Sequence, residues 1–355
     1  IEKSYKLLRG EEMKRAVLTV KETKRDNNAG PKAKMDIEKF LVDNGFVKWN
    51  FTINQKSILQ KARVAYLDIP NFFNKNENQK IDEVFLQYPT YSKIVTKQLI
   101  KRLKKLNSKV FLIVHDVESL RLHYGEENYI REELDMFNLV DGLIIHNEKM
   151  AQWLKENGVN VPMESLEVFD YDNPNPLVNN DEYRKSVCFA GNLTKAGFLQ
   201  NLSLKEVSLN IFGPNPADKY GQNISYQGQY SPEDLSNHLN DNFGLVWDGT
   251  TPTTCDGIFG NYMKYNNPHK ASLYLSSGIP VVIWRKAALS KFIEENNLGI
   301  AVDSLTELDE VLSKMSLSKY ENLLKNVRDV SQKLKKGFFI EKAIQNLENK
   351  VSENK

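Results

Sequence analysis

The chain has 355 residues, of which 41% are hydrophobic and 26% are charged. This length exceeds one ordinary hydrophobic core and predicts two domains, and the composition is typical of a soluble globular protein. The 48 basic and 46 acidic side chains leave a net charge of +2. Because so small an excess creates no strong cationic field, we expect no nucleic-acid partner and no membrane as the main partner.

The cysteines and the apolar runs exclude further classes of protein. Cys188 and Cys255 are too few for a disulfide framework, and their spacing matches no metal site. Cys188 lies in the apolar run 187–190, where a buried thiol is expected. No run approaches the roughly 18 apolar residues of a membrane span, and no signal peptide is recognised. We therefore expect a cytoplasmic protein without a metal or a bound cofactor.

The first half of the chain alternates apolar runs with helical patterns. Residues 1–12 show no convincing strand and are set aside as an appended segment. The expected strands are 16–20, 63–68, 109–115 and 142–146, and the expected helices are 31–44, 91–106, 130–137 and 150–157. Residues 71–80 are expected to form a polar loop, in which exposed Phe72 and Phe73 leave room for a homo-oligomer. This alternation predicts parallel strands joined by crossover helices.

The helix expected at 91–106 has a cationic outer face. Its basic residues between 97 and 105 lie opposite apolar residues at Leu99, Ile100 and Leu103. A solvated face is the plain interpretation. The alternative is peripheral contact with anionic lipid, which suits a lipid-linked acceptor.

A linker and a second alternating unit follow. Residues 170–176 hold two prolines among short polar residues, and proline blocks both helices and central strands. The strands expected beyond it are 186–191, 207–212, 223–227, 243–247, 280–284 and 299–302, with a capped helix at 232–239. The tail 317–355 favours helix and is long enough to return to the first domain. The predicted division is 13–169, 170–176, 177–330 and a returning helix at 331–355.

The strongest functional signal lies in the segment 266–283. A polar loop with Asn266 and Asn267 leads into Pro268, which pre-sets the start of a short helix. Lys270 adds a full charge at the helix start, where free N–H groups and the helix dipole already favour an anion. A Gly278-x-Pro turn and a buried strand follow. This order predicts a nucleotide-sugar site.

Other loops of the second unit leave expected strand ends with suitable groups. Gly191 permits close backbone approach and Lys195 could pair with a phosphate, although a solvent-facing turn is an equal alternative. The backbone at Phe212 and Gly213 could read a nucleobase, although a plain turn is an equal alternative. The hydroxyl of Tyr230 could reach a phosphate, although a core tyrosine is an equal alternative. Asp248 follows a strand and could line the sugar pocket. These remaining candidates are Phe212, Gly213, Tyr230 and Asp248.

Two α/β domains, a linker and a helical tail favour the GT-B glycosyltransferase architecture. Ligands of such sheets bind beyond the carboxyl ends of the strands, here in a cleft between parallel sheets. This places Asn28, Ala29 and Gly30 opposite the donor, with a plain surface turn as the alternative. His115 and Asp116 follow the most apolar strand, where either could accept the proton of an acceptor hydroxyl. A structural role for this pair stays open.

These motifs resemble those of GT-B glycosyltransferases that extend O-linked GlcNAc on serine-rich adhesins, and of related bacterial β-1,6-galactofuranosyltransferases. The resemblance spans most of the chain and is strongest from Cys188 to Ile283. It implies that Asn266, Asn267 and Lys270 bind UDP, with Lys195 and Tyr230 on the diphosphate. The chain departs from retaining GT-B enzymes, which usually place a glutamate where it has Leu273.

The combined hypothesis is a metal-independent hexosyltransferase with a UDP-sugar donor and a glycan or glycoprotein acceptor, most simply O-linked GlcNAc. Inversion is favoured by the resemblance and by the missing glutamate. Galactofuranosyl transfer is one alternative. A catalytically silent UDP-sugar-binding subunit and a UDP-sugar epimerase are two others. The residues do not choose the hexose, the acceptor or the linkage.

Overall fold

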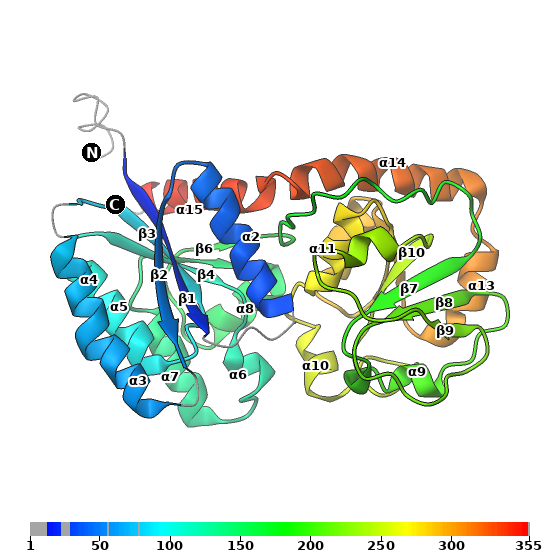
Figure 1. Cartoon of the computed structure of the whole chain (residues 1–355), viewed down its shortest axis with the longest axis horizontal. Helices are drawn as coiled ribbons and strands as arrows, with labels where there is room; N and C mark the ends of the chain where they lie inside the picture. Colours follow the sequence, from blue (N-terminus) through cyan, green and yellow to red (C-terminus); the bar gives the residue numbers. More distant parts are fainter. Residues whose placement is uncertain (1–12, 23–28, 55–56, 77–78, 354–355) are drawn as a thin grey trace.

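The computed structural model describes residues 13–22, 29–54, 57–76 and 79–353, and only the backbone of residues 29 and 30. Two α/β domains lie side by side, and a long helix near the C-terminus runs along the second towards the first (Figure 1). The segment 1–12, interpreted above as appended, lies outside the described residues. Each domain contains a six-stranded parallel sheet, as the alternation of strands and helices predicts.

The first sheet has the strand order β2-β1-β3-β4-β5-β6, and all its pairs are parallel. Its strands are β1 (Arg15–Glu22), β2 (Val47–Ile53), β3 (Glu83–Tyr88), β4 (Lys109–Val114), β5 (Gly142–Ile145) and β6 (Met163–Ser165). Every residue of β3 and β5 is buried, as expected of parallel strands that helices cover on both faces. The strand order reverses between β1 and β3, where such sheets form a crevice.

The helices of this domain follow the strands in turn. They are α2 (Ala29–Asp43), α3 (Ile58–Arg63), η1 (Val64–Asp68), α4 (Ile69–Lys75), α5 (Lys93–Lys105), α6 (Glu118–Arg121), α7 (Glu127–Phe137) and α8 (Glu148–Glu156). The amphipathic helix predicted around 91–106 is α5, which buries Leu99, Ile100 and Leu103. Its basic residues lie on the opposite face.

The strand expected at 63–68 is wrong, because these residues form the π-helical turn η1 between two α-helices. A short apolar run fits a strand or a buried helix equally well, and periodicity alone does not separate them. The missed strand is β2, where Trp49, Phe51 and Ile53 are buried in strict alternation with more exposed neighbours. The strand β3 was also missed, inside a stretch without alternation.

The loop expected at 71–80 is likewise wrong in its first part, which belongs to α4. Phe73 is buried and Phe72 partly buried, and both rings contact Trp49 and Phe51 of β2. The two phenylalanines therefore cover the edge of the sheet. They do not form the exposed surface that the sequence analysis offered for self-association.

The second sheet has the order β12-β11-β10-β7-β8-β9, again entirely parallel. Its strands are β7 (Ser186–Ala190), β8 (Ser208–Phe212), β9 (Ile224–Tyr226), β10 (Phe243–Val246), β11 (Val281–Trp284) and β12 (Gly299–Val302). All six were predicted within two residues at either end. Cys188 of β7 is fully buried, as expected. The order reverses between β7 and β10, which places a second crevice there.

Short helices connect these strands. They are η2 (Leu193–Lys195), α9 (Phe198–Asn201), η3 (Leu235–His238), α10 (Gly257–Tyr262), α11 (His269–Ser276), α12 (Ser290–Glu295), η4 (Leu305–Glu307) and α13 (Leu308–Ser313). The helix expected at 232–239 is only the short 3-10 turn η3. The helix after Pro268 is α11, as predicted.

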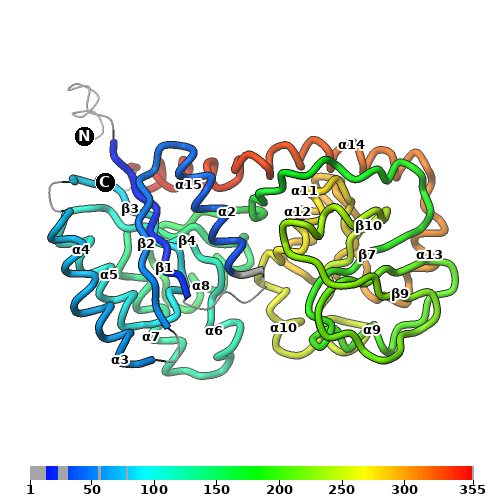
Figure 2. The backbone as a smooth tube through the Cα atoms, viewed as in Figure 1, coloured from blue at the N-terminus to red at the C-terminus, as the bar shows by residue number. Residues whose placement is uncertain are grey.

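The helical tail consists of α14 (Leu317–Leu334) and α15 (Phe338–Glu353). Figure 2 shows α14 running along the second domain and α15 continuing over the first, where it packs on β5 and β6. Gly337 separates them with a φ of 74°, and a Cβ there would lie 2.7 Å from Phe40 Cβ. Asp170 then accepts hydrogen bonds from the amides of Phe339 and Ile340, at 3.1 and 2.7 Å. The expected linker therefore caps the returning helix.

We predict that Asp170→Ala lowers the free energy of unfolding by about 1–2 kcal/mol, the usual cost of losing a helix cap. Asp170 is fully buried, so the two amides would lose their partner without gaining water. Chemical denaturation of the variant, the parent and Asp329→Ala measures the effect. Asp329 is an exposed carboxylate on α14 and serves as the control. Equal stability of the three proteins would show that the cap does not hold α15.

Candidate functional site

The start of α11 lies beside the crevice between β7 and β10. Lys270 reaches from α11 so that its Nζ lies 3.3 Å from Asp248 Oδ1 and 4.6 Å from the ring centroid of Phe189. A Cβ added to Gly191 would lie only 3.1 Å from Lys270 Cε. Three predicted residues, Gly191, Asp248 and Lys270, therefore meet at the point where the strand order reverses. A cation and the free amides of a helix N-terminus converge there.

The neighbouring loops form a surface of bare backbone. Gly213 has a φ of 138°, and a Cβ on it would lie 1.9 Å from the carbonyl oxygen of Gly191. The amide of Gly191 donates to the carbonyl of Phe212 at 3.0 Å, and the amide of Gly213 donates to Gly228 at 2.9 Å. Glycine is therefore required at 213, and the predicted residues Gly191, Phe212 and Gly213 lie together. Without side chains here, a ligand can approach the backbone closely.

Lys195 and Tyr230 lie on two other loops at the carboxyl edge of the same sheet. Lys195 is exposed, and its Nζ lies 4.3 Å from the ring centroid of Phe259 in α10. The hydroxyl of Tyr230 donates to the carbonyl of Gln227 at 3.2 Å, and its ring stacks on His238. Their contact with a ligand stays a prediction.

Asn267 is engaged differently from its neighbour Lys270. It is 3% exposed, and its side-chain amide donates to the carbonyls of His146 and Glu167, at 2.6 and 3.0 Å. Its side-chain oxygen accepts from Asn147 at 2.8 Å, and its backbone amide donates to His146 Nδ1 at 2.8 Å. All these partners belong to the first half of the chain. Asn267 thus joins the two domains, and the nucleotide contact that the resemblance implies for it stays a prediction.

Asn266, in contrast, keeps an unused group. Its side-chain oxygen is buried and has no hydrogen-bond partner among the described residues. It directly precedes the residue that joins the domains, two positions before Pro268. Its oxygen therefore remains able to accept a hydrogen bond from a ligand hydroxyl, in keeping with the UDP contact that the resemblance implies.

His115 directly follows β4, at the carboxyl end of the first sheet, in a buried network of hydrogen bonds. His115 is 8% exposed, and its Nε2 lies 2.8 Å from Gln87 Oε1. Gln87 Nε2 donates to Thr19 Oγ1 and to the carbonyl of Lys34, at 2.7 and 3.0 Å. Because a carbonyl only accepts, the amide orientation is fixed and His115 Nε2 carries the proton. Burial holds the pKa of His115 well below its usual value, so the ring is neutral.

Asp116 lies nearer to solvent than His115, with one quarter of its side chain exposed. Its Oδ2 forms an ion pair with Arg121 Nη1 at 3.0 Å, and Arg121 Nη2 also contacts Glu118 Oε1 at 2.7 Å. Burial raises the pKa of Asp116 to about 6, while Arg121 lowers it. An ionised carboxylate of this basicity suits proton abstraction near neutral pH.

Three residues of this edge were missed by sequence reasoning. Lys34 is 4% exposed, donates to the carbonyl of Pro89, and has a pKa lowered by burial to about 7. It shares a helical face with Ile37 and Leu41, and a lysine on an apolar stripe is a signal that the sequence contains. Tyr262 carries no comparable signal, because its partner Val117 lies 145 residues away. Arg121 pairs with nearby Asp116 and Glu118, but a single arginine at such spacing does not stand out in the sequence.

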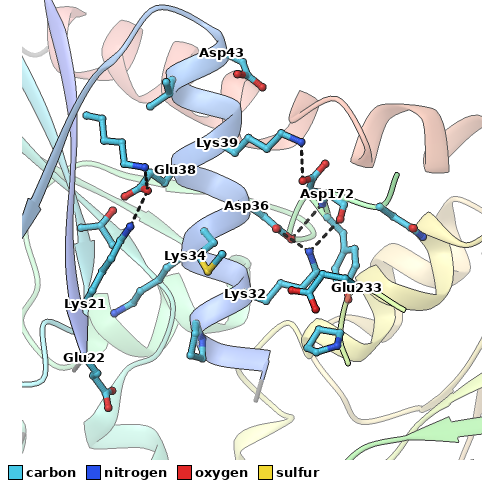
Figure 3. A pocket seen from close by; sticks show the side chains of 18 of the residues that line it. Lys21, Glu22, Lys32, Lys34, Asp36, Glu38, Lys39, Asp43, Asp172 and Glu233 are labelled. Atoms are coloured by element: carbon cyan, nitrogen blue, oxygen red, sulfur yellow. Dashed lines mark hydrogen bonds and ion pairs between the residues drawn. The ribbon is translucent and has the colours of Figure 1, made fainter. Parts of the chain in front are cut away.

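A groove of about 800 Å³ runs along α2, between the end of β1 and the linker (Figure 3). Lys34, Glu38 and Lys21 lie on one side of the helix, and Lys32 and Asp36 lie on the other. Tyr171 and Glu233 extend its lining to the linker and the second domain. The groove is therefore rich in donors and acceptors.

Of the predicted residues Asn28, Ala29 and Gly30, the last two belong to the described part of the chain. Asn28 lies outside the described residues, and Ala29 and Gly30 contribute backbone to the start of α2, just after β1. Within the described part of the chain, no three His, Cys, Asp or Glu side chains gather as a metal site. The described helices include none with the length and apolarity to traverse a bilayer.

Two family models match almost the whole described chain. The N-terminal domain of the glucosyltransferase 3-like proteins matches residues 15–168, and their C-terminal domain matches residues 187–347. The β-1,6-galactofuranosyltransferase WbbI of Escherichia coli K12 is 34% identical over 66% of this chain and 69% of its own. Glucosyltransferase 3 of Streptococcus gordonii is 31% identical over 74% and 78%.

Solved structures share the fold at low identity. An α-glucosyltransferase in complex with UDP has a TM-score of 0.55 at 10% identity, covering 96% of this chain and all of its own. A glycosyltransferase from Rickettsia africae has a TM-score of 0.58 at 11% identity, with coverage of 97% and 100%. These neighbours confirm the predicted GT-B arrangement of two parallel-sheet domains. The chain belongs to the glucosyltransferase 3-like family and is a glycosyltransferase of the GT-B fold.

Proposed function

We propose that the chain transfers a hexosyl group from a UDP-sugar to a hydroxyl of an acceptor glycan. The observation that carries this proposal is the position of Lys270. It places a cation at the N-terminus of α11, beside the glycine-lined backbone that follows β7 and β8. A nucleoside diphosphate matches this arrangement, because its charge is concentrated and its oxygens accept from amides and ammonium groups.

In the proposed reaction the acceptor oxygen attacks the anomeric carbon as the bond to the UDP oxygen breaks. Lys270 and the amides of α11 stabilise the negative charge that develops on the departing diphosphate. Asp116 takes the proton of the acceptor hydroxyl, with His115 held behind it as a neutral ring. Attack on the face opposite the leaving group gives inversion. In this proposal the step needs no metal ion, and full activity in the presence of EDTA would support that part.

The groove along α2 is the proposed acceptor site, because its charged side chains offer many hydrogen bonds to sugar hydroxyls. The names of the two relatives point to different products, one a galactofuranoside and one a glucoside. We propose O-linked GlcNAc as the acceptor, on the resemblance to the adhesin-glycosylating enzymes, and galactofuranosyl transfer as the alternative. Cytoplasmic location, membrane contact and self-association stay predictions from the sequence.

A transfer assay tests this function. Purified protein is incubated with UDP-glucose, UDP-galactose, UDP-galactofuranose or UDP-GlcNAc and an O-GlcNAc peptide, and products are identified by mass spectrometry and NMR. We expect one donor to yield a glycosylated peptide of inverted anomeric configuration. Interconversion of free donor without acceptor would instead indicate an epimerase. Binding of UDP without turnover of any donor would indicate a silent subunit.

We predict that Lys270→Ala weakens UDP binding roughly 10- to 100-fold, the effect of losing a charge-assisted hydrogen bond. Isothermal titration calorimetry measures the dissociation constant. Lys264→Ala, which removes an exposed lysine six residues earlier, is the matched control and is expected to keep the parent's affinity. An unchanged affinity in the Lys270 variant would contradict the proposed diphosphate site.

We also predict that Asp116→Asn lowers kcat roughly a hundredfold or more while UDP affinity is retained. In the parent, kcat/KM should fall as pH drops through about 6, because protonation removes the base and the pKa of Asp116 is raised to that value. Initial rates between pH 5 and 8 show this limb. Near-normal transfer by the variant would show that another group is the base. His115→Ala then tests the first alternative.

A further inference from the structure

Tyr262 belongs to the second domain, and its side chain contacts the first domain at the carboxyl end of β4. It ends α10, which packs against α6 beside Asp116. The phenol is 2% exposed, and its oxygen accepts a hydrogen bond from the amide of Val117 at 3.1 Å. The residue that follows Asp116 in the first domain is thus held by a side chain of the second domain.

The direction of the hydrogen bonds determines what the phenol does. Because the amide of Val117 can only donate, the Tyr262 oxygen accepts there and its own proton remains free to donate. The carboxylate of Asp116, the residue before Val117, lies within interaction range of the phenol. Arg121 meets the same carboxylate at 3.0 Å. Arg121 of the first domain and the phenol of the second domain therefore both lie near the Asp116 carboxylate.

We propose that Tyr262 is a positioning residue for Asp116, through which the second domain orients the base of the first. This inference rests on the proposed function, in which Asp116 accepts the acceptor proton. Tyr262 lies eight residues before Lys270 on the same continuous segment. One segment of the second domain therefore provides both the cation for the donor and the orienting hydroxyl for the base. Separation of the domains would remove the hydroxyl from Asp116.

Several other groups face Asp116 and stay in place when the phenol is altered. Arg121 and Lys34 lower the pKa of Asp116, and Glu118 raises it. Tyr91 also lies within electrostatic range of the carboxylate. In the proposed arrangement the phenol of Tyr262 donates to Asp116 and stabilises its ionised form, so its loss alone should raise the pKa of Asp116.

The test is Tyr262→Phe, which keeps the ring and removes only the hydroxyl. We expect kcat to fall about tenfold with KM for the UDP-sugar unchanged, as for an interaction that matters in the transition state. The acidic limb of kcat/KM should move to higher pH by about 0.5–1 unit, because a bond to the ionised base is lost. Tyr320→Phe is the control, since it removes a fully buried phenol that bonds Asn180 and Asn242 in the second domain.

A double variant separates positioning from a purely structural role. In an Asp116→Asn background, Tyr262→Phe should not lower the residual rate further, because its effect passes through the carboxylate. An unshifted pH limb in Tyr262→Phe, or additive losses in the double variant, would overturn the inference and leave Asp116 as the proposed base. Near-normal transfer by Asp116→Asn alone would instead remove the proposed base.

Discussion

The contact between the two domains depends on hydrogen bonds that residues 262–270 of the second domain form with the first domain. Asn267 donates to two carbonyls of the first domain and accepts from Asn147, while its backbone amide binds His146. His146 Nε2 in turn donates to the carbonyl of His115 at 3.0 Å, so both ring nitrogens are engaged. Burial lowers the pKa of His146 to about 4, which keeps the ring neutral in this role. The two domains are therefore joined here by a buried network with matched donors and acceptors.

This arrangement gives the two adjacent asparagines different tasks. Asn267 is nearly inaccessible and holds the domains together, whereas Asn266 keeps a free side-chain oxygen and Lys270 directs its charge into the crevice. A ligand bound at Lys270 would lie three residues from the contact between the domains. The proposed donor site and the contact between the domains therefore belong to one short segment of the chain.

Sequence reasoning succeeded where local pattern decides structure. The six strands of the second sheet are short apolar runs with clear turns, and the helix after Pro268 follows from its start signal. It failed at residues 63–68, where a short apolar run fits a strand or a buried helix equally well. It also overlooked β2, although the alternation of that strand is present in the sequence. The site divides in the same way. Lys270 was readable because its charge stands at a helix start, but the partners of Asn267 and Tyr262 lie more than a hundred residues away.

The central claim is that one segment of the second domain holds the donor diphosphate and also binds the first domain through Asn267. A crystal structure of the protein soaked with UDP tests it most directly. The account predicts density for the diphosphate against Lys270 Nζ and the first amides of α11, with Asn267 still bound to His146. Density for UDP elsewhere in the molecule, or a diphosphate that leaves Lys270 paired only with Asp248, would contradict it.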